Sequence, residues 1–388
     1  MPEHYKIIDQ KARHFYQTLE KQGVPVNEEL LNSLLKEKAK LYLDAQTELE
    51  VKFHFKPNPN DQEHIARIAT AKGISLPKTS TGKLQSDQIT IERTGDSDLK
   101  KLSELRQIRR KISVLTGIKE AVKEGRVYPS YKFDPELGRV HQGGDVKCDN
   151  WDDEIQDLVR LPGHIILVAD YERMELKVLA YLSGDSQLKE DLKGDPYIVL
   201  AKKVYHLEHL KAIDKELRNK AKVAFLALIY GNTIGGVAAQ LKVDYKEAKM
   251  LISALKMRYP TAFQYLEDWA NEALNFGQVI SYHERIKNID TTKGEDYVRR
   301  LGYNSRQQNT AGDLAKIGFT NLYEDSRLKE KRVQFITTVH DSCIMAIPED
   351  SDLDLLKEII KEDMVDKNDT NFDLKVDFKL GISWAKAN

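Results

Sequence analysis

The feature that most constrains the fold is a short apolar run, IILVA at residues 165–169, which ends in Asp170. The run lacks the polar alternation of a half-exposed strand, so we predict a strand that is buried on both faces of its sheet. Such a strand requires packed layers on either side. With 388 residues, of which 41% are apolar, the chain can supply these layers and is long enough for two or three packed units. This composition excludes a disordered chain.

The rest of the pattern predicts an α+β protein. Short apolar segments at 333–339, 343–347 and 373–379 are typical of strands, whereas residues 185–285 are mostly helical. The N-terminal part is also expected to be helical, with Asn27 placed to cap one of its helices. We therefore expect a sheet that a helical insertion interrupts in the sequence.

The net charge is −1, from 60 basic and 61 acidic residues, which argues against a protein that coats a polyanion with a uniformly positive surface. The charge is nevertheless uneven. Residues 98–132 hold ten Lys or Arg against four Asp or Glu, and a basic helix is expected at about 98–124. Any contact with nucleic acid should therefore be local.

The two cysteines, Cys148 and Cys343, cannot form a disulfide framework. The sequence lacks the run of about 18 apolar residues that a membrane span requires, and its charged start does not resemble a secretory signal. We therefore expect a cytoplasmic protein without a membrane partner.

Carboxylates stand at the ends of two predicted strands. Asp170 closes the first strand, and Asp341 lies in a predicted turn between 333–339 and 343–347. Two such aspartates in one sheet could hold a pair of Mg²⁺ ions, which prefer oxygen ligands. Alternatively, Asp170 could cap the helix expected after it, and Asp341 could be an ordinary turn residue. The spacing alone leaves these interpretations open.

A predicted helix at 217–231 opens with basic residues and closes with an aromatic one. Arg218, Lys222, Leu226 and Tyr230 recur every four residues. Lys222 and Tyr230 would lie about 12 Å apart along the helix axis, close to the length of a nucleoside triphosphate. Cations at one end and a flat ring at the other suit that ligand. A buried helix with a solvated basic end explains the same pattern.

Three segments, in this order, resemble motifs of the polymerase module of family A DNA polymerases, the bacterial DNA polymerase I family. Residues 170–177, DYERMELK, resemble the first motif, DYSQIELR. Residues 218–231 resemble the second, R-x-x-x-K-x-x-x-F-x-x-x-Y-G, and residues 339–342, VHDS, resemble the third, VHDE. Weaker similarities to the family's thumb at 76–83 and to its C-terminal G-x-x-W at 381–384 extend the resemblance over nearly the whole chain.

The resemblance implies a right-hand polymerase fold with a helical thumb, an antiparallel-sheet palm and helical fingers. On this basis we expect the thumb and an N-terminal helical arm at 1–125 and the first part of the palm at 126–184. The fingers are expected at 185–295 and the second part of the palm at 296–388. Because little sequence precedes the thumb segment, we expect a module without its own proofreading exonuclease.

The resemblance also implies roles for individual residues. Asp170, Asp341 and the backbone carbonyl of Tyr171 would bind two Mg²⁺ ions, for which Mn²⁺ can substitute. The implied catalytic residues are Asp170, Asp341 and Lys222, and Glu175 would exclude a ribose 2′-hydroxyl. The implied nucleotide-binding residues are Glu175, Tyr197, Arg218, Lys222, Leu226 and Tyr230. The implied DNA-binding residues are Arg139, Asn150, Arg300, Asn304, Gln308 and His340.

The sequence departs from the family pattern at four positions. Leu226 stands where the family has an aromatic residue, and Ser342 replaces the second carboxylate of VHDE. Tyr197 aligns with a phosphate-contacting His of the family, and Arg306 replaces a Pro. Since the motif residues themselves are kept while their surroundings differ, the pattern indicates a divergent, phage-like branch.

The resemblance implies a DNA-templated DNA polymerase of replication or repair, which adds deoxynucleotides to a primer 3′-hydroxyl by two-metal phosphoryl transfer. We expect a monomer whose partners are primer–template DNA and dNTPs, with a processivity or exonuclease subunit as a further candidate. The resemblance also implies a protein associated with the nucleoid or, if phage-encoded, located in the host cytoplasm. One alternative is a single-subunit RNA polymerase, which would usually carry a small residue at position 175. The other is a catalytically silent DNA-binding component of a replication or defence complex, which would not need Asp170 and Asp341.

Overall fold

The fold of the computed structural model, which describes residues 4–79 and 81–387, is organised in two units. The larger unit combines three stretches of the chain, at residues 4–22, 130–143 and 161–387. The smaller unit comprises residues 23–129 and 144–160. Each unit has its own hydrophobic core and is described by itself.

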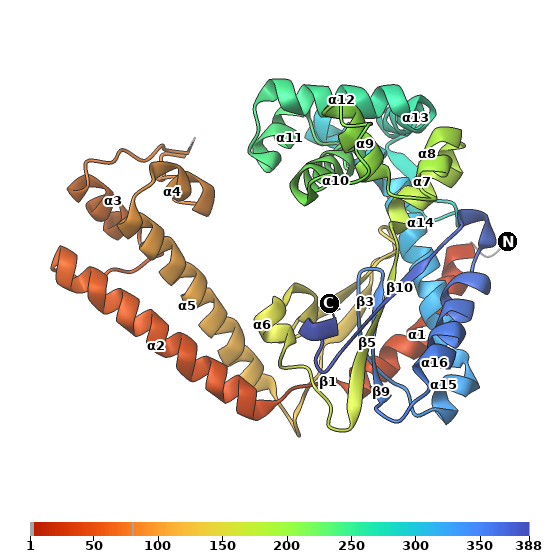
Figure 1. Cartoon of the computed structure of the whole chain (residues 1–388), viewed down its shortest axis with the longest axis horizontal. Coiled ribbons are helices and arrows are strands. Elements are labelled where there is room, and N and C mark those ends of the chain that lie inside the picture. Colours follow the sequence, from red (N-terminus) through yellow and green to blue (C-terminus); the bar gives the residue numbers. More distant parts are fainter. Residues whose placement is uncertain (1–3, 80, 388) are drawn as a thin grey trace. The chain divides into compact units, whose positions relative to one another are not determined.

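A four-stranded antiparallel sheet forms the centre of the larger unit (Figure 1). Its strands lie in the order β10-β5-β9-β8. The four strands are β5 (His164–Tyr171), β8 (Gln334–Val339), β9 (Ser342–Pro348) and β10 (Val376–Gly381). These are the four strands that the sequence predicts, and β5 is central with residues 166–169 buried, which confirms the prediction for its apolar run.

Helices cover this sheet and supply the layers that its buried strand requires. The longest helix, α14 (Glu295–Glu324), contacts α1 (His4–Gln22). Phe15 of α1 lies against the rings of Phe319 on α14 and Phe335 on β8. Burial of such apolar side chains stabilises the unit by roughly 1.5–3 kcal/mol each. The other helices of the larger unit outside the helical block described next are α7 (Met174–Ser183), α15 (Ser326–Glu330), α16 (Leu353–Lys361), a π-helix (Glu362–Asp366) and short 3-10 helices at Thr291–Lys293, Thr370–Phe372 and Ala385–Ala387.

A block of helices with its own apolar cluster lies between β5 and β8 in the sequence, as predicted. In its core Phe225 is stacked on Tyr259, with ring centroids 5.3 Å apart. The helices of this block are α8 (Ser186–Asp191), α9 (Pro196–Val204), α10 (Lys215–Ile229), α11 (Ile234–Leu241), α12 (Tyr245–Arg258) and α13 (Pro260–Phe276).

Two small hairpins of the larger unit are not predicted by the sequence pattern. One pairs β3 (Ser130–Phe133) with β4 (Val140–Gly143), and the other pairs β6 (Gln278–Ile280) with β7 (Ile286–Asn288). Strands of three or four residues give too short an alternation to recognise. Both hairpins contribute to the site described below.

The smaller unit is built on two long helices, α2 (Glu28–Phe53) and α5 (Ser97–Ala121). The Asn27 side chain accepts from the backbone N–H of Leu30, which confirms its predicted role as a cap. The predicted basic helix at about 98–124 is α5. The remaining elements are α3 (Gln62–Ala71), α4 (Gln88–Thr94), α6 (Asp153–Gln156), a 3-10 helix (Cys148–Asn150) and the short strands β1 (Val24–Pro25) and β2 (Arg126–Val127).

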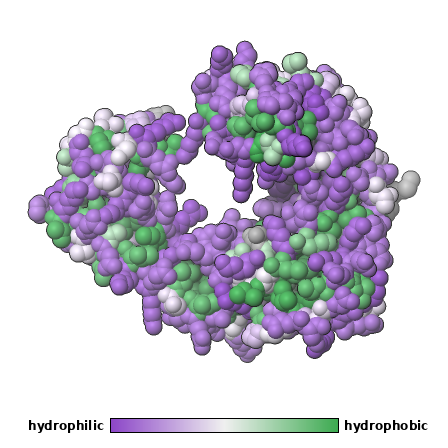
Figure 2. Space-filling model, viewed as in Figure 1, coloured by the Kyte–Doolittle hydropathy of each residue, from purple (hydrophilic) through white to green (hydrophobic). Residues whose placement is uncertain are grey.

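The predicted thumb, palm and fingers boundaries remain predictions. The segment expected as thumb and arm, 1–125, is divided between the units, because α1 belongs to the larger unit and α2 to α5 belong to the smaller one. On the face drawn in Figure 2, hydrophilic residues predominate and apolar residues form scattered groups. Among the described residues, no helix combines the length and apolarity that crossing a membrane requires.

Candidate active site

The pairing of β5 with β9 brings Asp170 and Asp341 together. Asp170 is the register partner of Ser342, so Asp341 lies beside it in the turn between β8 and β9. His340 adopts a left-handed conformation in this turn, with φ 55°. The backbone N–H of Tyr171 donates to the carbonyl of Asp341 at 3.4 Å. The turn therefore holds Asp341 at the end of β5, as the metal interpretation of the sequence requires.

The alternative that Asp170 caps the following helix is wrong. Helix α7 begins at Met174, and its N-cap residue is Arg173, which is left-handed with φ 51° and makes no side-chain cap bond. The carboxylate of Asp170 thus has no structural role in starting the helix. The departure of Arg173 from ordinary backbone geometry marks the sharp change of direction between the strand and the helix.

The two carboxylates are half-buried and repel each other. Burial, followed by the charge of Asp170, raises the pKa of Asp341 to about 7. Burial also raises the pKa of Asp170, although the positive charges of Lys379 and Lys222 oppose that shift. Two acids whose charged forms are disfavoured by burial and mutual repulsion form a site that a cation would stabilise.

Glu175 connects three other predicted site residues. The Tyr230 hydroxyl donates to one of its carboxylate oxygens, and Arg139 Nη2 lies 2.9 Å from the other. With its amide oxygen turned toward Arg139, Gln308 accepts from both terminal guanidinium nitrogens, at 3.0 and 3.1 Å. Residues from α7, α10, α14 and the β3–β4 loop are thus linked at one place. Both Arg139 and Glu175 act electrostatically on Asp341, so this network adjoins the aspartate pair.

The basic end of α10 is held by the start of α9. The Arg218 guanidinium lies 2.7 Å from Asp195 Oδ2 through Nη2 and donates to the same oxygen from Nε at 2.8 Å. It also lies over the ring of Tyr197, 5.5 Å from its centroid. Tyr197 is 3% exposed, and burial raises its pKa to about 12, so its hydroxyl is neutral at pH 7. One turn further along α10, Lys222 is exposed.

The C-terminal end of α10 packs closely on α14. Tyr230 ends the helix and Gly231 follows in a left-handed conformation, φ +76°, as the sequence predicts. A Cβ on Gly231 would lie 2.9 Å from the Cα of Arg300, so only glycine fits here. Leu226 is half-buried and packs against the core of the helical block. Arg300, Asn304 and Gln308, four residues apart on α14, are exposed or half-exposed.

Comparison with known proteins agrees with the arrangement of these site residues. Residues 28–386 match DNA polymerase family A. The chain belongs to this family.

DNA polymerase I of Caldicellulosiruptor bescii is 26% identical over 407 residues, which cover 98% of this chain and 47% of the relative. DNA polymerase I of Lactococcus lactis (strain IL1403) is 27% identical over 390 residues, covering 95% of this chain and 43% of the relative. The chain therefore spans just under half the length of these polymerases.

A solved structure, the POL domain of Pol1 from M. smegmatis in complex with DNA primer-template and dNTP, has the same fold. It superposes with a TM-score of 0.86 at 22% identity and covers 98% of this chain and 70% of that one. The right-hand polymerase fold expected from the sequence is confirmed.

For a member of DNA polymerase family A, the donor set at the strand ends is small. In the parts of the chain that the structure describes, no group of three or more His, Cys, Asp or Glu side chains gathers as a metal site. Asp170 and Asp341 lie close enough to repel each other, and Ser342 stands where the family motif VHDE has its second carboxylate. Two carboxylates with raised pKa values nevertheless fit a hard divalent cation, which removes their repulsion and prefers oxygen ligands.

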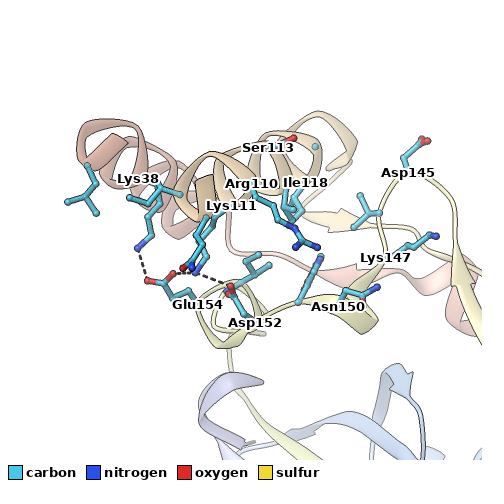
Figure 3. A pocket seen from close by; sticks show the side chains of 18 of the residues that line it. Lys38, Arg110, Lys111, Ser113, Ile118, Asp145, Lys147, Asn150, Asp152 and Glu154 are labelled. Atoms are coloured by element: carbon cyan, nitrogen blue, oxygen red, sulfur yellow. Dashed lines mark hydrogen bonds and ion pairs between the residues drawn. The ribbon is translucent and has the colours of Figure 1, made fainter. Parts of the chain in front are cut away.

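The two remaining predicted DNA-binding residues are His340 and Asn150. His340 is exposed in the β8–β9 turn. Asn150 is exposed in the smaller unit, where it lines a cavity of about 950 Å³ between α2, α5 and the segment 144–155. Figure 3 shows an ion-pair cluster on the wall of this cavity. Its members are Lys38, Lys111, Asp152 and Glu154, with Lys38–Glu154 at 2.7 Å and Lys111–Asp152 at 2.9 Å.

Three residues that organise the site are not predicted by the sequence. Asp195 holds Arg218, and an Asp before Pro is a known start signal for a helix, so its cap position could have been predicted. Asn309 and Arg285 support the loop that carries Arg139. No sequence signal identifies these two, because their role depends on which carbonyl groups the fold brings to them.

Proposed function

We propose that this chain catalyses DNA-templated DNA synthesis. The primer 3′-hydroxyl oxygen would form a bond to the α-phosphorus of a dNTP. The bond from that phosphorus to the oxygen that bridges the α- and β-phosphates would break, and pyrophosphate would leave. The observation that carries the proposal is the pair Asp170 and Asp341, placed at one strand end in the same unit as a helix that bears Arg218 and Lys222.

The residues of the chain have distinct parts in this reaction. Asp170 and Asp341 supply the negative charge that attracts cations to the reacting end of the primer. Arg218 and Lys222 would bind the phosphates, since Arg and Lys are the usual phosphate ligands, and Lys222 would donate a proton to the leaving group. Glu175 would occupy the space of a ribose 2′-hydroxyl, and its bond to Tyr230 fixes it there.

Asp170 and Asp341, with the backbone carbonyl of Tyr171, would hold two Mg²⁺ ions. When bound, the ions would lower the pKa of the primer hydroxyl and neutralise the charge that develops on the pyrophosphate. Because Ser342 replaces a carboxylate near this pair, we expect the chain to need a higher Mg²⁺ concentration than a site with three acids.

Contacts with DNA are proposed for Arg139, Arg300, Asn304, Gln308 and His340 in the larger unit and for Asn150 in the smaller one. The M. smegmatis relative is described in complex with primer-template and dNTP, which supports both ligands for this chain. Polymerases must accept any sequence, so these contacts should go to the backbone and the minor groove.

Primer extension tests the proposal. Purified protein with a primed template, dNTPs and Mg²⁺ should extend the primer, and Asp170→Asn or Asp341→Asn should slow extension by at least about a thousandfold, because charge stabilisation by metals contributes several kcal/mol. Asp377→Asn is the matched control, since Asp377 is the exposed register partner of Asp170 on β10. This variant should retain most activity.

Each alternative predicts a different result. A catalytically silent DNA-binding component would bind the primed template but extend nothing with Mg²⁺ or Mn²⁺. An RNA polymerase would prefer rNTPs, which the presence of Glu175 argues against. With a mismatched primer end, release of the terminal nucleotide would contradict the expectation that the chain has no proofreading activity.

A further inference from the structure

The loop that carries Arg139 is clamped from two sides. This loop, residues 134–139, joins β3 to β4. It closes on itself through Asp134, whose backbone N–H donates to the carbonyl of Arg139 at 3.0 Å and whose side chain accepts from the N–H groups of Glu136 and Leu137. Arg139 is the last residue of the loop, so the position of the loop determines the position from which the Arg139 side chain extends.

Two neighbouring carbonyls of this loop accept from buried side chains of other elements. Asn309 on α14 donates to the carbonyl of Glu136 at 2.7 Å, and Arg285 of the β6–β7 hairpin donates to the carbonyl of Pro135 at 3.1 Å. Both donors are 0% exposed. A hydrogen bond between groups shielded from water is stronger than a solvated one, and its loss leaves a carbonyl unsatisfied.

The backbone of the loop also lies directly on α14. Gly138 is left-handed, φ +65°, and a Cβ there would lie 2.9 Å from the carbonyl oxygen of Asn309. A Cβ on Gly312 of α14 would lie 2.7 Å from the carbonyl oxygen of Gly138. The loop therefore has almost no freedom to shift along the helix.

Arg285 is itself fixed by a buried cluster of charges. Its guanidinium contacts Asp9 of α1 at 2.9 Å and Asp313 of α14 at 2.6 Å, and Lys316 pairs with both acids. Burial opposes the ionisation of Asp313, but His283, Lys316 and Arg285 lower its pKa to about 2. Removing Arg285 would leave buried acids with one counter-charge fewer, which is strongly destabilising, so Asn309 is the better residue to change.

We propose that Asn309 is a positioning residue: through the carbonyl of Glu136 it sets the loop that aims Arg139 at Glu175 and at the primer end. Arg285 is the second clamp on the same loop. Asn309 touches neither substrate nor metal in this proposal and acts only through Arg139. The inference rests on the proposed function for its effect on rate.

A double-mutant cycle on the rate of nucleotide addition tests this role. Asn309→Ala should lower the maximal rate by about tenfold, because a small misplacement of a positioning group is costly, while the Kd for primer–template changes by less than about twofold. In the Arg139→Ala background, Asn309→Ala should have no further effect, because the residue through which it acts is gone. Additive losses, or an unchanged rate for Asn309→Ala in wild-type background, would overturn the proposal.

Two further variants separate positioning from general damage. Thr320→Ala removes another buried hydrogen bond of α14, from Thr320 Oγ1 to the carbonyl of Lys316, and should leave the rate unchanged. If Asn309→Ala does not fold, Gly312→Ala disturbs the same loop by crowding the carbonyl of Gly138, and the same cycle with Arg139→Ala applies.

A measurement without substrate tests the positioning role of Asn309 independently of catalysis. The coupling between Arg139 and Glu175 is measured from the thermal unfolding of Arg139→Ala, Glu175→Ala and the double variant. This coupling should fall in the Asn309→Ala background (or the Gly312→Ala one) and persist in the Thr320→Ala background. A wild type that fails to extend primers would reject the function, whereas an undiminished coupling would reject the positioning role alone.

Discussion

The carboxylate of Asp195 holds the guanidinium of Arg218, with Oδ2 at 2.7 Å from Nη2 and 2.8 Å from Nε. The same carboxylate accepts from the backbone N–H groups of Tyr197 and Ile198 and so caps α9. The cation proposed to bind phosphate is thus paired with an acid of the protein. A triphosphate must compete with that acid.

Asp195→Asn should therefore strengthen nucleotide binding. Asn is as good an N-cap as Asp, so α9 should keep its start while the competing charge is removed. We expect the Kd of the primer–template complex for dNTP to fall by about threefold or more, in line with a partly exposed ion pair. Asp214→Asn is the control, since it removes the same charge from the N-cap of α10. A weaker affinity would mean that Asp195 orients Arg218 rather than competing for it.

Asp341 should lower the stability of the metal-free protein at neutral pH. Its pKa is about 7 in the folded chain and near 3.8 when unfolded, so the folded state binds the proton more tightly. Stability due to this group is present at about pH 4 and is lost as the pH rises to about 7. We expect Asp341→Asn to raise the melting temperature at about pH 8 by a few degrees, with the difference disappearing toward pH 4.

The same measurement with Mg²⁺ completes this test. Mg²⁺ should stabilise the wild type but not Asp341→Asn, because a ligand that binds only the folded state raises its melting temperature. Its effect on the wild type should weaken as the pH falls below about 7, where protons compete for the site. Equal stabilisation of both proteins by Mg²⁺ would argue that the ion binds elsewhere.

Glu175→Ala should relax the choice between sugars. Removing the side chain opens the space proposed to exclude a 2′-hydroxyl, so the ratio of rNTP to dNTP incorporation, measured as kcat/KM, should rise by about a hundredfold. Glu175→Gln is the control, because it keeps the volume but loses the negative charge and one of the two acceptor oxygens that contact Arg139 and Tyr230. It should lower the rate while preserving the preference for dNTPs. A similar ratio for both variants would reject steric exclusion.

Glu154→Gln should strengthen the binding of DNA by the smaller unit. In the wild type Glu154 pairs with Lys38 and Lys111, so these cations are partly neutralised. Freeing them should add about one phosphate contact and steepen the plot of log affinity against log salt by about 0.9. Glu120→Gln, which changes an exposed carboxylate on α5, the helix of Lys111, controls for net charge. Equal slopes for both variants would mean that Lys38 and Lys111 only support the structure.

The sequence alone predicts a residue's structural role where that role depends only on the residue's own segment. The apolar run before Asp170 predicts a central strand, and Gly231 predicts the end of α10, because burial and left-handed backbone leave direct signals in the local pattern. The role of Asp170 required the fold. A cap and a metal ligand look alike in the sequence. The structure excludes the cap, because the N-cap of α7 is Arg173, and the register with Ser342 brings Asp170 beside Asp341.

The clamp on the Arg139 loop could not be predicted in this way. Asn309 and Arg285 act on carbonyl groups more than 140 residues away in the sequence, and any buried carbonyl can serve as an acceptor. The hairpins β3–β4 and β6–β7 that bring them together are too short to produce a periodic signal. The same holds for Asp195, whose partner Arg218 lies on a different helix.

The strand order of the main sheet affects how the chain folds during its synthesis. Strand β5 is flanked by β9 and β10, which end at Pro348 and Gly381. During synthesis the apolar strand β5 therefore leaves the ribosome long before either neighbour exists, with both edges open to other chains. Ribosome stalling or truncation before residue 342 would leave β5 unpaired, so such fragments should aggregate or recruit chaperones, and the sheet can close only after β10, which ends at Gly381, has been made.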